Sequence, residues 1–317
     1  MKRLMIRAAA AVLITLLPVQ TQAANLVPGG QVVGLQLRSG SVTVVAYDEN
    51  LGANARSAGL KIGDEILKIG DLSVTCAEDV RSALYSCEPL ALTVRRDGQE
   101  RELSLTPVST GDGPRLGVYL RQGIAGIGTI TFYDPESGCF GTLGHGVCDG
   151  KGNLLDMMEG SAYEAAVASV KKGKAGDPGQ LKGNAGNETG TLLRNTPQGV
   201  FGRMKEVVSG ELLPTAQYGD LHTGSALIRS TIGQSGIREY SVEILRIYPE
   251  DRSDGRNFLL KVTDPKLLET TGGIVQGMSG SPIIQDGKLV GAVTHVLVND
   301  PTRGYGIFIE NMLEAAK

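Results

Sequence analysis

The chain has 317 residues, a formal net charge of −3 and 44 glycines. This near-neutral charge gives no reason to expect a nucleic-acid partner, because nucleic-acid-binding domains carry strongly basic surfaces. The many glycines, the absence of tryptophan and the scarcity of long helical periodicities favour a mainly β protein with short strands and many turns. The length leaves room for two modest domains.

The N-terminus has the pattern of a secretory signal peptide. Residues 1–7 are basic, residues 8–19 are apolar, and small residues precede a cleavage point after Ala23. An apolar run of this length is short for a membrane span, which needs about 20 residues. We therefore predict a signal peptide over residues 1–23 and export across the cytoplasmic membrane, with retention of the segment as an anchor as the alternative. No other segment has the composition of a membrane span.

A first domain is predicted over residues 24–107. Residues 57–70 resemble the A-G-L-x-x-G-D-x-I-L stretch of PDZ domains, and the Asp97-Gly98 pair predicts a tight hairpin turn. Residues 108–114 are rich in turn formers and predict a linker. A second domain is then expected over residues 115–317.

If the first domain is a PDZ domain, its peptide groove should lie along Gly34, Leu35, Gln36 and Leu37. A peptide would add a strand to the free edge of this segment. The occupant would be a segment of the chain itself or the C-terminal peptide of another protein. An inert spacer is the alternative.

A candidate nucleophile stands near the C-terminus. Ser279 is flanked by Gly277 and Gly280 and is followed by Pro282. The glycines allow a sharp turn that points successive backbone N–H groups into a cavity. The N–H groups of Gly277 and Ser279 would then hold the oxyanion of an acyl-transfer reaction. The alternative is an ordinary Gly/Ser turn between two strands.

The strands around Ser279 carry a family resemblance. The hairpin over residues 282–293 and the strand-like runs at 291–296 and 304–308 resemble the C-terminal barrel of chymotrypsin-like serine peptidases. Residues 272–313 resemble the stage IV sporulation protein B family of serine peptidases. The resemblance implies a chymotrypsin-like two-barrel peptidase domain, in which Thr294 and His295 line the substrate cleft.

The general base is assigned to His145, one of three histidines in the chain. His222 lies in a polar turn and is expected at the surface, whereas His295 is expected in the cleft. His145, between Gly144 and Gly146, remains as the group that takes the Ser279 proton. The sporulation family also has its catalytic histidine at this point. A structural histidine in a turn is the alternative.

The acidic partner of the base is assigned from the resemblance. A strand-like run over residues 258–263 ends at Asp264, where the family's catalytic aspartate falls. Asp264 would fix the tautomer of His145 and stabilise its charged form. Asp134 and Asp220 are the alternatives.

The four cysteines fall into two pairs. Cys76 and Cys87 are expected to be core thiols. Cys139 and Cys148 bracket His145, and an exported chain could oxidise them to a disulfide. A zinc site at Cys139, His145 and Cys148 lacks a clear fourth ligand, so neither a metal nor a cofactor is expected.

These observations predict a secreted serine endopeptidase. The family resemblance further implies a role in endospore formation, in the space between the forespore and mother-cell membranes. There the enzyme would cleave a membrane-bound regulator, which triggers activation of a sigma factor, and would cleave itself before Gly34. Gly273, six residues before Ser279, predicts no preference for Lys or Arg before the cleaved bond. The alternative is a non-catalytic PDZ-containing protein whose peptidase-like domain binds a peptide without cutting it.

Overall fold

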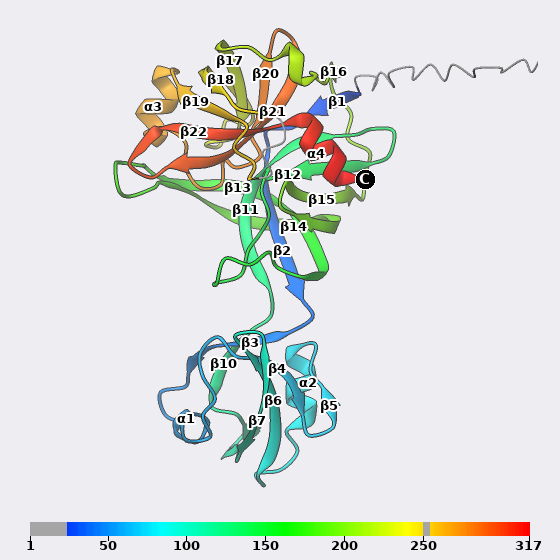
Figure 1. Cartoon of the computed structure of the whole chain (residues 1–317), viewed down its shortest axis with the longest axis vertical. Coiled ribbons are helices and arrows are strands. Elements are labelled where there is room, and N and C mark those ends of the chain that lie inside the picture. Colours follow the sequence, from blue (N-terminus) through cyan, green and yellow to red (C-terminus); the bar gives the residue numbers. More distant parts are fainter. Residues whose placement is uncertain (1–23, 250–253) are drawn as a thin grey trace, which may run out of the picture.

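The computed structural model describes residues 24–249 and 254–317. The chain is mainly β and forms two bodies, a larger one with two barrels and a smaller one joined to it by two strands (Figure 1). The predicted signal peptide lies outside the described residues. Within these residues, no helix is both long enough and apolar enough to cross a bilayer.

The first barrel closes through one long strand that has partners on both edges. In spatial order, the described part of the chain contributes six strands to it: β2 (Val32–Ser39), β11 (Ile124–Tyr133), β12 (Cys139–Thr142), β15 (Gly199–Met204), β14 (Gln180–Thr196) and β13 (Met157–Lys171). The first half of β11 pairs with β2 and its second half with β12, which closes the ring. Two short strands, β1 (Asn25–Pro28) and β16 (Leu213–Pro214), extend the sheet beside β11. Buried Leu35, Phe140 and Val200 fill the interior.

The second barrel is built from the C-terminal half of the chain. Its six strands in the described residues are, in spatial order, β17 (Gly224–Ser230), β18 (Arg238–Ile247), β19 (Phe258–Val262), β22 (Asp300–Phe308), β21 (Lys288–Leu297) and β20 (Pro282–Gln285). Alternate residues of β18, namely Tyr240, Val242 and Ile244, point into the core, as the period of a half-buried strand requires. A single 3₁₀ turn (Tyr218–Asp220) precedes β17, helix α3 (Pro265–Thr271) follows β19, and helix α4 (Ile309–Ala316) ends the chain. The two closed barrels confirm the predicted chymotrypsin-like architecture.

The smaller body is inserted into the first barrel, between β2 and β11. It contains β3 (Val42–Tyr47), α1 (Ala53–Ser57), β4 (Glu65–Ile69), β5 (Leu72–Ser73), α2 (Ala77–Ala83), β6 (Leu90–Arg96), β7 (Gln99–Leu105), the hairpin β8 (Val108–Thr110) and β9 (Gly113–Arg115), and β10 (Val118–Arg121). It has its own apolar core, which includes Leu60 and Ile66. Beside this core, buried Asp64 accepts two hydrogen bonds of 2.6 Å from the guanidinium of Arg96. A planar pair of this kind fixes the geometry of both partners.

This topology corrects the predicted domain boundaries. Residues 24–39 belong to the first barrel rather than to the first domain, and β10, beyond the predicted linker, belongs to the inserted sheet. The predicted linker itself contains β8 and the start of β9.

The predicted peptide groove along Gly34, Leu35, Gln36 and Leu37 is wrong. Each of these residues pairs with β11 on one side and with β13 on the other. The segment therefore has no free edge to which a peptide could add as a strand.

Candidate active site

The nucleophile loop joins α3 to β20 and places Ser279 between two residues of unusual backbone conformation. Gly277 and Gly280 have φ angles of 98° and 95°, a region that side chains rarely adopt. A Cβ on Gly280 would lie 1.9 Å from the carbonyl oxygen of Thr129. The glycines are therefore required both by the turn and by the close approach of the first barrel.

Strand β11 of the first barrel holds this loop of the second barrel. The Thr129 hydroxyl donates to the Gly277 carbonyl at 2.8 Å, and the Thr129 N–H donates to the Ser279 carbonyl at 2.9 Å. The Thr131 hydroxyl donates to the Gly280 carbonyl at 2.8 Å. Three carbonyls of the loop are thereby tied to one strand, and both threonines are fully buried.

Two backbone N–H groups of the same loop, unlike its carbonyls, have no hydrogen-bond partner in the described chain. Within the described residues, neither the Gly277 N–H nor the Ser279 N–H donates a hydrogen bond to the protein, and both residues line the pocket that also contains His145. A buried donor without a partner is costly, so such groups call for an explanation. Two such N–H groups beside a serine are the donors that the predicted oxyanion site requires.

The loop that follows β12 and carries His145, here called the base loop, reaches the same pocket from the first barrel. Beyond β12, Leu143 and Gly144 both have left-handed φ angles, 69° and 68°, and this turn delivers His145. Left-handed backbone at a buried leucine is strained and persists only where the surroundings enforce it. Here the loop packs tightly on the second barrel, since a Cβ on Gly144 would lie 2.8 Å from the Thr294 methyl group.

The imidazole of His145 is held through one ring nitrogen. Nδ1 lies 2.9 Å from the Gly146 carbonyl oxygen. Because a carbonyl only accepts, Nδ1 carries the proton and Nε2 keeps its lone pair. Burial lowers the pKa of His145, and the bond to Gly146 opposes this shift. The ring is therefore neutral near pH 7 and able to accept a proton.

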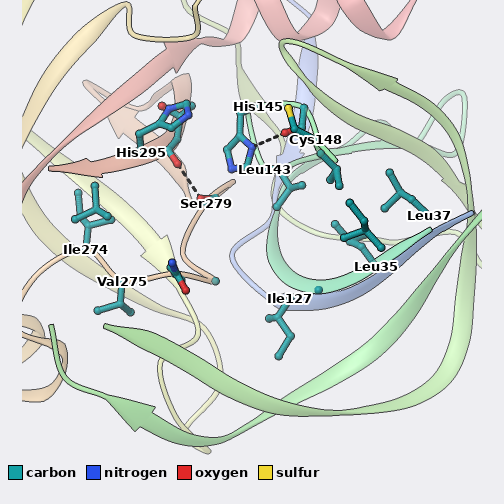
Figure 2. A pocket seen from close by; sticks show the side chains of 18 residues that line it. Leu35, Leu37, Ile127, Leu143, His145, Cys148, Ile274, Val275, Ser279 and His295 are labelled. Carbon is teal, nitrogen blue, oxygen red and sulfur yellow. Dashed lines mark hydrogen bonds between the residues drawn. The ribbon is translucent and has the colours of Figure 1, made fainter. Parts of the chain in front are cut away.

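A second histidine lies against the base. The ring centroids of His145 and His295 are 5.1 Å apart, and the two rings meet near Ser279 at one end of the pocket (Figure 2). Burial, and after it the charge of His145, lowers the pKa of His295 to about 4. Both His295 and Thr294 line the pocket, where the sequence placed them. The third histidine, His222, is exposed and bonds Asp286 at 2.7 Å.

The Ser279 hydroxyl donates to the Thr294 carbonyl at 2.8 Å. Its proton is thus directed to β21 rather than to His145. Catalytic hydrogen bonds are often formed only when substrate is present, and a serine side chain turns by rotation about a single bond.

Asp264 does not line the pocket that contains His145 and Ser279. Its carboxylate accepts from the N–H of Leu267 at 2.9 Å and from the N–H of Ser241 at 3.5 Å, so it caps the N-terminus of α3. Gly255, ahead of β19, lies against Gly144 of the base loop, whereas Asp264 follows the far end of β19. Between them lies the five-residue strand β19, which spans roughly 17 Å at about 3.3 Å per residue. The assignment of Asp264 as partner of His145 is therefore not supported by the structure.

The two alternative aspartates are also engaged elsewhere. Asp134 accepts from the Ser137 hydroxyl and the Glu136 N–H in its own turn. Asp220 accepts from the Gln217 N–H and pairs with Lys288. Neither forms a hydrogen bond with His145, whose Nδ1 bonds Gly146.

The four cysteines lie apart as thiols. Cys76, Cys87, Cys139 and Cys148 are all free thiols, so the disulfide between Cys139 and Cys148 is not formed. In the described part of the chain, no group of three or more His, Cys, Asp or Glu side chains could hold a metal ion.

Sequence reasoning missed Thr129, Thr131 and the Gly146 carbonyl. The threonines alternate along a strand like ordinary inward-facing residues, and a backbone carbonyl leaves no mark in the sequence. Only the contact between the barrels shows what these groups do.

Most of the chain matches a known protein family. The family model described as SpoIVB peptidase S55 matches residues 113–313, more than half of the chain. The chain belongs to the SpoIVB peptidase S55 family. It is therefore a serine peptidase by family.

Curated relatives match this S55 peptidase over shorter stretches. The Serine protease Do-like HtrA of Lactococcus lactis subsp. lactis (strain IL1403) is 48% identical over 59 residues, which cover 18% of this chain and 14% of that protein. A putative zinc metalloprotease of Vibrio cholerae serotype O1 is 33% identical over 130 residues, 40% of this chain and 27% of that protein. The matches thus span about a quarter or less of the relatives' own lengths. Among solved structures, Rv3671c protease from M. tuberculosis in its active form aligns with a TM-score of 0.37 and 14% identity, covering 61% of this chain and 73% of that one.

Proposed function

We propose that this S55 peptidase is a serine endopeptidase in which Ser279 attacks a peptide carbonyl. His145 Nε2 takes the hydroxyl proton and later returns it to the leaving amine, while the Gly277 and Ser279 N–H groups hold the oxyanion. The observation that carries the proposal is that His145 and Ser279 line one pocket together with two unpaired N–H groups.

In this mechanism the Gly146 carbonyl fixes the tautomer of His145. A carbonyl can hold the Nδ1 proton, but it lacks the full charge with which a carboxylate stabilises an imidazolium. Ser279 must also leave its bond to Thr294 when substrate binds. Both features point to a peptidase that reaches full activity only with substrate in place.

The test is labelling by a serine-directed fluorophosphonate. The wild-type chain should be labelled and the Ser279→Ala variant should not, because alanine has no hydroxyl to form the covalent bond. Peptide hydrolysis by this variant should fall roughly 10⁶-fold in rate. Ser281→Ala is the matched control, because Ser281 is fully buried and bonds Ser230 at 3.1 Å. A wild-type chain that binds peptides but is never labelled would support the alternative, a binding protein with a peptidase-like domain.

We also propose that the enzyme acts in endospore formation after export, in the space between the forespore and mother-cell membranes. Its substrate there would be a membrane-bound regulator of sigma-factor activation, and it would cleave its own chain before Gly34. Family membership and the signal-like residues 1–23 support this role. Replacing the chromosomal gene by its Ser279→Ala form should block the formation of heat-resistant spores and leave the N-terminus unprocessed.

We propose, finally, that the inserted body is a PDZ domain. The motif over residues 57–70 supports this, as does a groove between α2 and β10, whose outer edge has no strand partner in the described chain. The occupant would be a self-segment or a C-terminal peptide. Peptides with free C-termini should bind and their amidated counterparts should not, as measured by fluorescence polarisation.

A further inference from the structure

The pocket beside Ser279 has two apolar walls, one from each barrel. Its volume is about 430 Å³. Ile274 and Val275 lie on one side of Ser279, and Leu35, Leu37 and Ile127 lie on the other (Figure 2). Among the lining residues that the structure describes, none is Asp, Glu, Lys or Arg. A charged substrate side chain would lose its hydration here without gaining a partner.

The chemistry of acyl transfer decides how a peptide lies between these walls. The carbonyl oxygen of the residue before the cleaved bond enters the oxyanion site, and the leaving amine receives its proton from the base. The oxyanion site belongs to the nucleophile loop of the second barrel, whereas His145 belongs to the first. The residue before the bond therefore faces the second-barrel wall, and the residue after it faces the first-barrel wall.

The second-barrel wall leaves little depth. Ile274 lies over β22 so closely that a Cβ on Gly304 would sit 2.6 Å from its Cδ1 atom. Val296 stands opposite Gly304 in the β21–β22 ladder and also lines the pocket. Ile274 and Val275 are only 2% and 1% exposed, so they form a packed floor. A long side chain before the cleaved bond would collide with this floor.

The first-barrel wall combines buried and half-buried side chains. Leu35 and Leu37 from β2 are 4% and 1% exposed, as buried as the second-barrel floor, whereas Ile124 and Ile127 from the facing stretch of β11 are half-buried. The wall is therefore open at the two isoleucines. There it accommodates a larger apolar side chain after the cleaved bond.

We infer that this S55 peptidase cuts between two apolar residues, a small aliphatic one before the bond and a larger one after it. Its substrate class is an extended apolar peptide segment. Ile274 determines the specificity before the bond, and Ile127 contributes to the specificity after it. This inference rests on the proposed function.

The experiment digests a peptide mixture that is varied at the two positions and identifies the products by mass spectrometry. The wild type should prefer Ala or Val before the bond and Leu or Phe after it. Ile274→Ala should raise the preference for Leu over Val before the bond by roughly 10- to 200-fold, the range of one or two methylenes in an apolar pocket. Ile127→Ala, at a half-buried residue of the opposite wall, is the matched control and should alter only the position after the bond.

Two outcomes overturn the inference: a preference of the wild type for a charged residue at either position, or an Ile274→Ala variant with unchanged selectivity. Ile274→Val serves as a milder variant if Ile274→Ala does not fold, and the wild-type preference decides on its own if neither does. Fluorophosphonate labelling is measured in parallel. A wild type that is labelled without apolar preference overturns this inference alone, whereas an unlabelled wild type overturns the proposed function as well.

Discussion

The two barrels hold the loops of Ser279 and His145 in different ways. The nucleophile loop of the second barrel is tied by its carbonyls to Thr129 and Thr131, so its N–H groups are held in place before substrate arrives. The base loop of the first barrel depends on a strained left-handed turn at Leu143 and on contact with the second barrel. The nucleophile loop thus contacts the other barrel through hydrogen bonds, whereas the base loop contacts it through packing. Substitutions that loosen the nucleophile loop should therefore weaken binding of the oxyanion, and substitutions that loosen the base loop should slow proton transfer.

The largest effect on the packing-dependent loop is expected from His145→Gln. Glutamine keeps a polar side chain but cannot act as the base, so the labelling rate should fall by roughly 10²- to 10⁴-fold. The denaturant midpoint of His145→Gln should stay close to that of the wild type, because Thr129 and Thr131, not His145, hold the nucleophile loop. His222→Gln, at an exposed histidine, is the control. Wild-type labelling of His145→Gln would remove His145 from the mechanism.

The pH dependence of labelling tests the electrostatics of the base loop. Burial lowers the pKa of His145 from its usual 6.5. His145 should therefore stay neutral somewhat below pH 6.5, and the labelling rate should not change there. At still lower pH the rate should fall about tenfold per unit as His145 is protonated. A midpoint above 6.5 in the pH–rate profile would contradict the burial of the ring.

The same burial affects stability with a definite sign. Below pH 6.5 the unfolded chain takes up protons that the folded chain refuses, and for His295 this continues down to about pH 4. The contribution of His295 to stability is thus present above pH 6.5 and is lost as the pH falls to about 4. Denaturant unfolding at a series of pH values would measure it.

The hydrogen-bonded loop is tested by Thr129→Val. The change keeps the shape of the side chain but leaves the buried Gly277 carbonyl without its partner, at a cost of about 1–3 kcal/mol. Labelling should slow by about tenfold because the Gly277 N–H is no longer held in position. Thr131→Val, which frees the Gly280 carbonyl instead, should destabilise the fold similarly while slowing labelling less. Equal slowing in both variants would contradict a specific role for Gly277.

The smallest effect on activity is expected from Asp264. Asp264→Ala removes the cap of α3 and should lower stability by about 1 kcal/mol, whereas Asp264→Asn, also a good capping residue, should not. Both should be labelled at nearly the wild-type rate. A loss in Asp264→Asn as large as in His145→Gln would mean that this carboxylate reaches the base in a conformation other than the one described.

Local chemistry made much of the second barrel predictable. The alternation in residues 240–244 marks β18, and Asp286-Gly287 forms the expected turn with φ angles of 51° and 74°. The sharp turn around Ser279 is predictable as well, because the flanking Gly277 and Gly280 allow its positive φ angles. The start of α3 could also have been read, since an aspartate before a proline is a common helix beginning.

The failures have a common physical origin in long-range pairing. The alternating segment at Gly34–Leu37 looks the same whether it lies at the edge of a sheet or inside one, and only its partners on β11 and β13 decide between the two. Likewise, nothing local to Asp264 shows that β19 carries it away from His145. Cys139 and Cys148 are near in sequence, but their strand and loop leave them as separate thiols.

The position of the inserted body has a consequence for how the chain can be engineered. Leu37 and Ile124 are direct neighbours in the β2–β11 ladder, so the chain re-enters the barrel next to where it left. The body is thus, topologically, an oversized hairpin tip that a short turn could replace. Leu37 and Ile124 also line the pocket beside Ser279. A movement of the inserted body would therefore be transmitted through β2 and β11 to the wall of this pocket.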